Sequence, residues 1–111
     1  MFRFVIFLAS LSFVSCTYHN LDEDVEEPIL FSCDTITWQQ DVLPIITSSC
    51  ATSGCHDGIS RLDWKDYNVV KNFAVSAKLR TRDRSMPPDF TLHQKDIDMI
   101  ACWVDKGAPE N

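Results

Sequence analysis

A short segment between residues 50 and 56 carries two thiols and an imidazole. Cys50 and Cys55 are separated by four residues, and His56 follows the second thiol directly. Each thiol can add across a vinyl group of a porphyrin, and the neighbouring imidazole can reach the iron, so this pattern indicates covalent attachment of haem. The usual attachment motif has two residues between the cysteines, whereas this one has four. Gly54 allows the tight turn that two bonds to one rigid ring require.

The chain contains five cysteines, and each of them can be given a use. If Cys50 and Cys55 bind haem and Cys16 takes a lipid, Cys33 and Cys102 remain as a pair. In an oxidising compartment such a pair is expected to form a disulfide. It would close a loop of about 70 residues and contribute on the order of 4 kcal/mol of stability. The alternative is that both are small buried apolar residues.

The first fifteen residues have the features of an export signal. Arg3 supplies the positive start, and residues 4–11 form an apolar run that is too short to span a membrane permanently. A signal that ends on Cys16 resembles a bacterial lipobox, and the alternative is an ordinary cleaved signal peptide. We therefore expect residues 1–15 to be a lipoprotein signal peptide. The mature protein would be exported and lipid-anchored to a bacterial membrane at Cys16, facing the periplasm or the cell surface.

Acidic residues are concentrated after the signal. Residues 16–32 contain five carboxylates and no apolar period, which is typical of a flexible tether. The whole chain has 10 basic and 16 acidic side chains, whereas residues 33–111 have 9 and 11. The domain predicted over 33–111 is therefore close to neutral, and this composition argues against nucleic-acid binding.

Helical periods without a convincing strand predict an all-α fold. Helices are expected over 38–48, with a bend near Pro44, over 64–73 and over 92–106. Residues 74–91 lack a clean period and contain two adjacent prolines, so we expect them to be mostly loop.

The helix expected over 92–106 is apolar on two faces, and Gly107 marks its end. The two stripes consist of Ile97, Ile100, Ala101 and Val104, and of Leu92, Met99 and Trp103. A helix of this kind must be covered by protein on one side and by something else apolar on the other. A haem ring would fill that place in so small a domain.

The order of these features resembles the monohaem cytochrome c domains of bacterial exported lipoproteins. The resemblance covers roughly residues 33–109 and depends on three motifs. These are Cys50-x4-Cys55-His56, Ser85-Met86-Pro87-Pro88 and Ile97-x2-Ile100-x2-Trp103-x3-Gly107-Ala108-Pro109. It implies a small cytochrome c-like helical domain wrapped around one covalently bound haem c. Cys50 and Cys55 would then be the thioether attachment points, His56 the proximal iron ligand and Met86 the distal ligand.

The Met86 segment supports that assignment, because its two prolines have fixed φ angles that can hold a short loop against a ring face. A methionine thioether raises the reduction potential relative to a second imidazole. His93 is the rival for this sixth position. Filling both axial positions favours electron transfer over oxygen chemistry, so we expect a carrier and not an enzyme.

The expected function is one-electron transfer with redox partner proteins. A basic run precedes Met86, and it is either a solvated loop or a group that neutralises haem propionates or steers an acidic partner. It consists of Lys78, Arg80, Arg82 and Arg84.

Two other classes of function remain open. One is a haem enzyme or sensor with an exchangeable sixth ligand. The other is a non-haem interaction module, stabilised by a Cys50–Cys55 disulfide or by zinc bound to Cys33, Cys50, Cys55 and His56.

Overall fold

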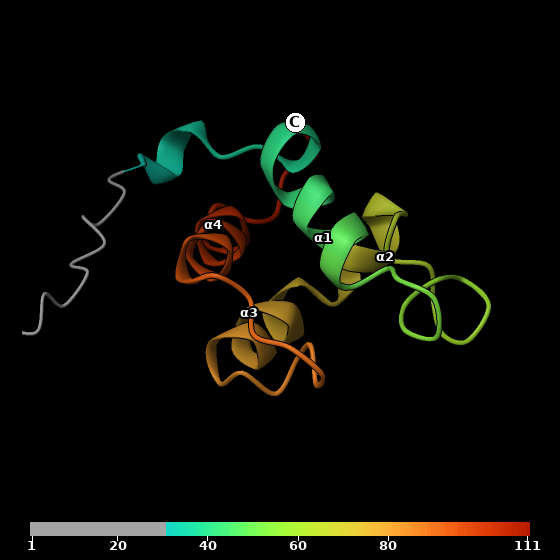
Figure 1. Ribbon diagram of the computed structural model, residues 1–111. Coiled ribbons are helices and arrows are strands. Elements are labelled where there is room, and N and C mark those ends of the chain that lie inside the picture. The colour runs from blue at the N-terminus through green and yellow to red at the C-terminus, as the bar shows by residue number, and fades with distance from the viewer. Residues whose placement is uncertain (1–30) are drawn as a thin grey trace, which may run out of the picture.

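Helices form all the regular structure in residues 31–111, the part of the chain that the computed structural model describes (Figure 1). They are the 3₁₀ turn η1 (Cys33–Thr35), the π-helical turn η2 (Trp38–Val42), α1 (Leu43–Ser49), α2 (Tyr67–Asn72), α3 (Ala74–Arg82) and α4 (Gln94–Asp105). The prediction of an all-α chain is confirmed for these residues. None of these helices is both long and apolar enough to cross a membrane. The predicted signal peptide, Cys16 and most of the predicted tether lie outside the described residues.

The helix predicted over 38–48 is present as two joined pieces, η2 and α1. Thr37 caps it, since its hydroxyl oxygen accepts a hydrogen bond from the Gln40 amide at 3.2 Å. The Asp41 carboxylate accepts the Thr37 amide at 2.7 Å. In a capping box this return bond comes from the third helical residue, and here the fourth supplies it in the wider π-type first turn. Pro44 falls in the first turn of α1, directly after the junction with η2.

The second helix begins later than the predicted start at residue 64. Asp66 caps α2, because its carboxylate accepts the amide of Asn68 at 2.8 Å. Asp63 instead accepts the amide two residues after it and holds a separate turn. Trp64 is therefore outside the helix, in the connection that leads to α2.

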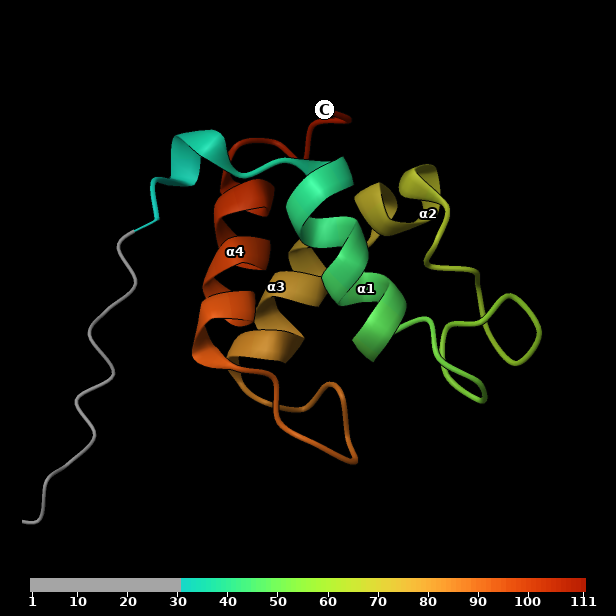
Figure 2. The ribbon, with the colours of Figure 1, turned by 45° about the horizontal axis from the view of Figure 1, so that its top comes forward.

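The prediction that residues 74–91 are mostly loop is wrong for Ala74–Arg82, which form α3. The buried face of α3 consists of the small residues Ala74, Ala77 and Thr81, whereas its larger apolar residues Val75 and Leu79 are exposed. The apolar period and the buried face therefore do not coincide. Small side chains let α3 lie closely beside α4 (Figure 2).

The last helix, α4, ends next to Gly107, as the sequence predicted. Gly107 has a φ of 90°, which favours glycine. Its amide donates to the Val104 carbonyl at 2.9 Å, and the Ala108 amide donates to the Trp103 carbonyl at 3.0 Å. This pair of bonds is a Schellman motif. His93 is the N-cap residue of α4, but its side chain makes no capping hydrogen bond.

Three buried aromatic residues join the helices. The ring centroids of Trp38 and Trp103 lie 5.2 Å apart, and those of Trp38 and Tyr67 lie 5.5 Å apart with an edge-on geometry. The Tyr67 hydroxyl donates to the Ala108 carbonyl at 2.8 Å, and the Trp103 indole donates to the Pro109 carbonyl at 2.8 Å. The segment after α4 thereby closes over the cluster.

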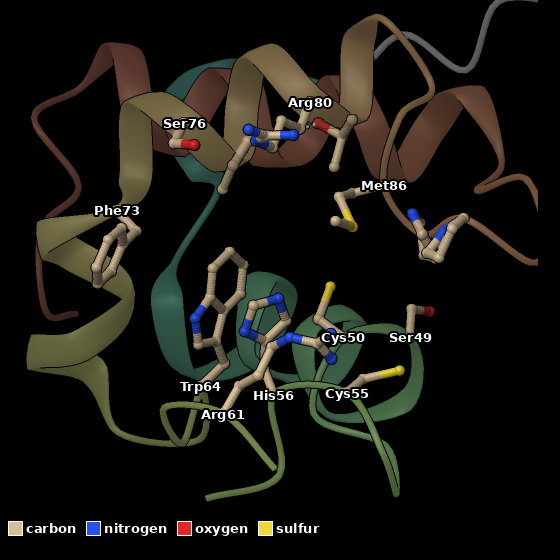
Figure 3. A pocket seen from close by; sticks show the side chains of 14 residues that line it. Ser49, Cys50, Cys55, His56, Arg61, Trp64, Phe73, Ser76, Arg80 and Met86 are labelled. Carbon is tan, nitrogen blue, oxygen red and sulfur yellow. Dashed lines mark hydrogen bonds between the residues drawn. The ribbon is translucent and has the colours of Figure 1, made fainter.

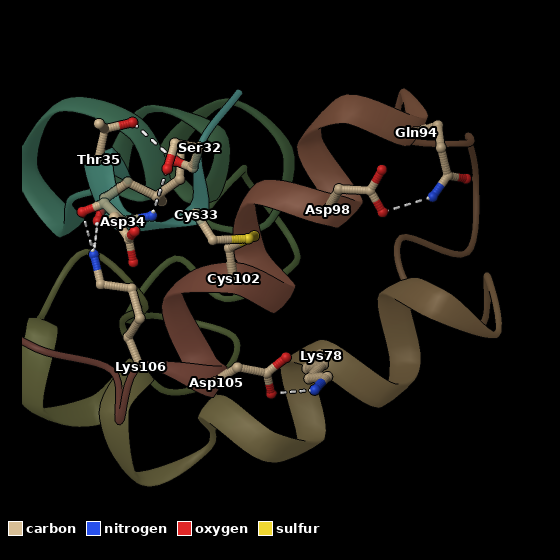
Figure 4. The surroundings of a disulfide bond; sticks show 11 residues. Ser32, Cys33, Asp34, Thr35, Lys78, Gln94, Asp98, Cys102, Asp105 and Lys106 are labelled. Carbon is tan, nitrogen blue, oxygen red and sulfur yellow. Dashed lines mark hydrogen bonds and ion pairs between the residues drawn. A yellow bond between two sulfur atoms is a disulfide. The ribbon is translucent and has the colours of Figure 1, made fainter. Parts of the chain in front are cut away.

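A disulfide between Cys33 and Cys102 ties η1 to α4 (Figure 4). The two Cα atoms lie 5.1 Å apart and the residues are 69 positions apart in the chain. Lys106 strengthens the same junction, since its ammonium group donates to the carbonyls of Asp34 at 2.8 Å and Ile36 at 3.0 Å. The start of the domain is thus held against its last helix.

We expect the double substitution Cys33→Ala/Cys102→Ala to lower the free energy of unfolding by about 4 kcal/mol, because the bond restricts a long loop in the unfolded chain. Urea unfolding followed by tryptophan fluorescence measures this difference. Wild-type protein treated with reductant should unfold at the same urea concentration as the variant. Equal stability of oxidised wild type and variant would contradict the expectation.

Candidate functional site

An apolar pocket of about 240 Å³ lies between the end of α1 with its following loop and α3 with its following loop (Figure 3). Cys50, Cys55, His56 and Met86 all line it. Figure 3 shows the two cysteines and the histidine on one wall and Met86 on the other. The structure therefore brings these four predicted site residues into one pocket. The rival residue His93 is exposed and does not line the pocket.

The cysteine loop folds back on itself. Cys50 is the C-cap residue of α1, and its carbonyl accepts the His56 amide at 3.0 Å. Within the loop, the Cys55 amide donates to the Thr52 carbonyl at 3.0 Å, and Gly54 has a φ of 81°. The four residues between the cysteines thus form a compact turn, and both thiols stay at the same pocket.

The Asp57 carboxylate makes three hydrogen bonds with backbone amides of the cysteine loop and the loop after it. Asp57 accepts the amides of Ser60 at 2.8 Å, Gly54 at 2.9 Å and Ile59 at 3.0 Å. These hydrogen bonds hold the pKa of the Asp57 carboxyl far below its usual range. The guanidinium of Arg61 donates to the Gly54 carbonyl at 3.0 Å, which places Arg61 at the pocket.

His56 is the part-buried imidazole of the site. Its ring stacks on the indole of Trp64, with centroids 4.2 Å apart and planes 26° apart. Burial lowers the pKa of His56, and the nearby charge of Arg61 lowers it further. Both effects favour the neutral ring, which is the form that binds metal ions.

Met86 is positioned by the end of α3. Its amide donates to the Arg80 carbonyl at 3.0 Å, and one residue earlier the Ser85 amide donates to the Asp83 carboxylate at 2.9 Å. These bonds turn the chain so that the Met86 side chain enters the pocket (Figure 3). Met86 remains 38% exposed. The pocket is therefore open to solvent beside the thioether.

The structure separates the members of the basic run. Arg80 lines the pocket. Lys78 forms an ion pair with Asp105 of α4, and Arg84 donates to the Gln94 side chain at 3.1 Å. Of these three residues, Arg80 is the one placed to form an ion pair with a carboxylate of a ligand in the pocket.

Several pocket residues were not predicted from the sequence. Arg61, Trp64 and Phe73 line the pocket together with a smaller adjoining cavity of about 200 Å³, to which Leu62 also contributes. Arg61, Leu62 and Trp64 lie in the connection before α2, and Phe73 joins α2 to α3. The helix predicted over 64–73 included Trp64 and Phe73 but did not indicate that they face a pocket.

The zinc alternative is not supported by the arrangement of its ligands. Cys33 is bonded to Cys102, which removes it from the set that included Cys50, Cys55 and His56. In residues 31–111 no group of three or more His, Cys, Asp or Glu side chains is placed to hold a metal ion. Cys50 and Cys55 are free thiols and are not bonded to each other.

Comparison of the chain with protein families, with characterised proteins and with solved structures finds no significant match. Any functional conclusion therefore depends on the chemistry and geometry of the pocket.

Cys50 is expected to react slowly with alkylating reagents in the folded, haem-free protein. Burial, and then the charge of Cys55, raise the pKa of the Cys50 thiol to about 11 from its ordinary 9.0. At pH 8 its thiolate fraction should be about 100-fold below that of the same thiol in urea, because each pKa unit is a factor of ten. Iodoacetamide labelling rates measured across pH by mass spectrometry test this.

Cys55→Ser is the matched control for this measurement. Because burial is the larger cause, Cys50 should still label slowly in the folded variant. Equal rates with and without urea would show that the thiol is not shielded.

Proposed function

We propose that this protein is a c-type cytochrome that transfers single electrons through one covalently attached haem. The observation that carries the proposal is the composition of the pocket. Two thiols and an imidazole occupy one wall, and a thioether sulfur enters from the other. Soft sulfur and imidazole donors are the axial ligand types used by electron-transfer cytochromes.

The remaining pocket residues suit a flat apolar ring with carboxylates at its edge. Trp64, Phe73, Ala77 and two prolines supply apolar walls. The adjoining cavity extends the apolar space past Leu62. The charged groups at the pocket are the guanidinium groups of Arg61 and Arg80, which can form charge-assisted hydrogen bonds with propionates.

Each protein group has a definite role in this proposal. Cys50 and Cys55 would hold the haem through thioether bonds. Each addition would consume one S–H bond and the π bond of one vinyl group and form one S–C and one C–H bond, so no oxidant is needed. His56 would bind the iron through its unprotonated ring nitrogen, and Met86 would bind it through its thioether sulfur. When bound, the haem iron takes up and releases one electron, and the protein sets its potential through ligation and burial.

The protein would be exported and anchored to a membrane by lipid. It would exchange electrons with redox partner proteins, and the domain itself would not catalyse a reaction. The disulfide between Cys33 and Cys102 supports this location, since structural disulfides persist in oxidising compartments. The free pair Cys50 and Cys55 is then available for haem attachment. The acidic segment after Cys16 would separate the domain from the membrane.

Covalent attachment can be tested after expression with a c-type maturation system. We expect haem to remain with the polypeptide after denaturation and acetone extraction, because thioether bonds survive this treatment. Cys50→Ala and Cys55→Ala should each retain haem through the remaining thiol at reduced yield, and the double variant should lose it. Cys33→Ala/Cys102→Ala is the control, which should retain haem. Complete extraction of haem from wild type would overturn the proposal.

Met86 can be tested by its effect on access to the iron. Replacing Met86 with Ala should remove the sixth ligand, so that the reduced protein binds carbon monoxide where wild type does not. His93→Ala is the matched control and should behave as wild type, because His93 lies away from the pocket. Carbon monoxide binding is measured by visible absorption. Ready binding by wild type would instead favour a sensor or enzyme with an exchangeable ligand.

A further inference from the structure

We propose that Trp64 is a positioning residue that sets the plane of the His56 imidazole, an inference that depends on the proposed ligand role of His56. A histidine ring rotates about a broad terminal torsion and needs an outside contact to fix it. In metal sites this contact is commonly a hydrogen bond from the second ring nitrogen. Here the contact is an aromatic stack.

The side-chain hydrogen bonds around this ring are made by its neighbours. Asp57, Arg61 and Asp63 bind backbone groups of the loop, and none of their bonds goes to the His56 imidazole. The ring instead lies nearly parallel to the Trp64 indole, with centroids 4.2 Å apart. Stacked aromatic rings attract one another beyond the burial of area, and this attraction depends on the relative orientation of the two rings. The stack therefore favours one orientation of the imidazole.

Trp64 is itself held independently of the imidazole. Its amide donates to the His56 carbonyl at 3.1 Å, which closes the loop of residues 57–63 at its base. The Asp63 carboxylate caps the turn that follows. The Trp64 ring also packs against the buried core. Because the core fixes the indole of Trp64, the indole in turn fixes the orientation of the His56 ring that stacks on it.

Figure 3 places Trp64 beside His56 on the same pocket wall. A tryptophan that served only to fill space would be replaceable by any apolar side chain of sufficient size. A tryptophan that orients the imidazole requires a flat aromatic face. Phenylalanine retains such a face, whereas leucine retains apolar volume without it.

The test compares Trp64→Phe and Trp64→Leu in the haem-loaded, oxidised protein. Proton NMR of the hyperfine-shifted haem methyl groups reports the orientation of the axial ligand planes. Trp64→Phe should preserve the order and spread of these resonances, and Trp64→Leu should change both. Tyr67→Phe controls for lost stability, because it removes a buried hydrogen bond outside the pocket and should leave the pattern unchanged.

The outcomes separate the two proposals. If wild type carries covalent haem but Trp64→Leu retains the wild-type pattern, only the positioning role is overturned. The same holds if both Trp64 variants change the pattern equally, since the effect would then follow volume. If wild type carries no covalent haem, the proposed function fails and the positioning role fails with it.

Discussion

The contact between Trp38 and Trp103 is the interaction on which the other elements depend. Both side chains are almost fully buried, and they join η2 at the start of the domain to α4 at its end. The helices are too short to be stable alone: α1 has 7 residues and α2 has 6. Tertiary packing must therefore supply their stability. The indole pair, with Tyr67 beside it, provides the common surface against which they assemble.

This packing decides where the pocket walls stand. η2 continues directly into α1, so the buried Trp38 also places the C-terminus of α1 and the Cys50 that caps it. α3 packs beside α4, and its end places Met86. Both pocket walls therefore depend on helices that the core holds together. Ala77 and Thr81 of α3 are buried and also line the pocket themselves.

Close to the pocket, hydrogen bonds from backbone amides to side chains hold the chain, in place of apolar packing. The loops are short of buried apolar groups and are held by side chains that accept backbone amides, chiefly Asp57 after His56 and Asp83 before Met86. Such bonds hold a loop in one conformation without a core of its own. The candidate ligand residues His56 and Met86 therefore stand beside turns that hydrogen bonds hold in one conformation.

The sequence alone predicted those features that depend on residues close together in the chain. The cap at Thr37, the end of α4 at Gly107 and the joint occurrence of two thiols with His56 were all readable without tertiary contacts. The cysteine count also singled out the pair that the disulfide joins. The signal peptide and the lipid at Cys16 remain predictions, because they lie outside the described residues.

Tertiary structure alone decided the features that depend on distant contacts. α3 was missed because its buried face is made of small residues, so hydrophobicity does not mark it. Asp63 and Asp66 are equally good caps locally, and the fold selects the second for α2. The two prolines already favoured Met86 over His93, but only the fold brings Met86 and Trp64 to the pocket and leaves His93 outside it. Where two residues were locally equivalent, as the two aspartates were, the packing of helices distant in sequence chose between them.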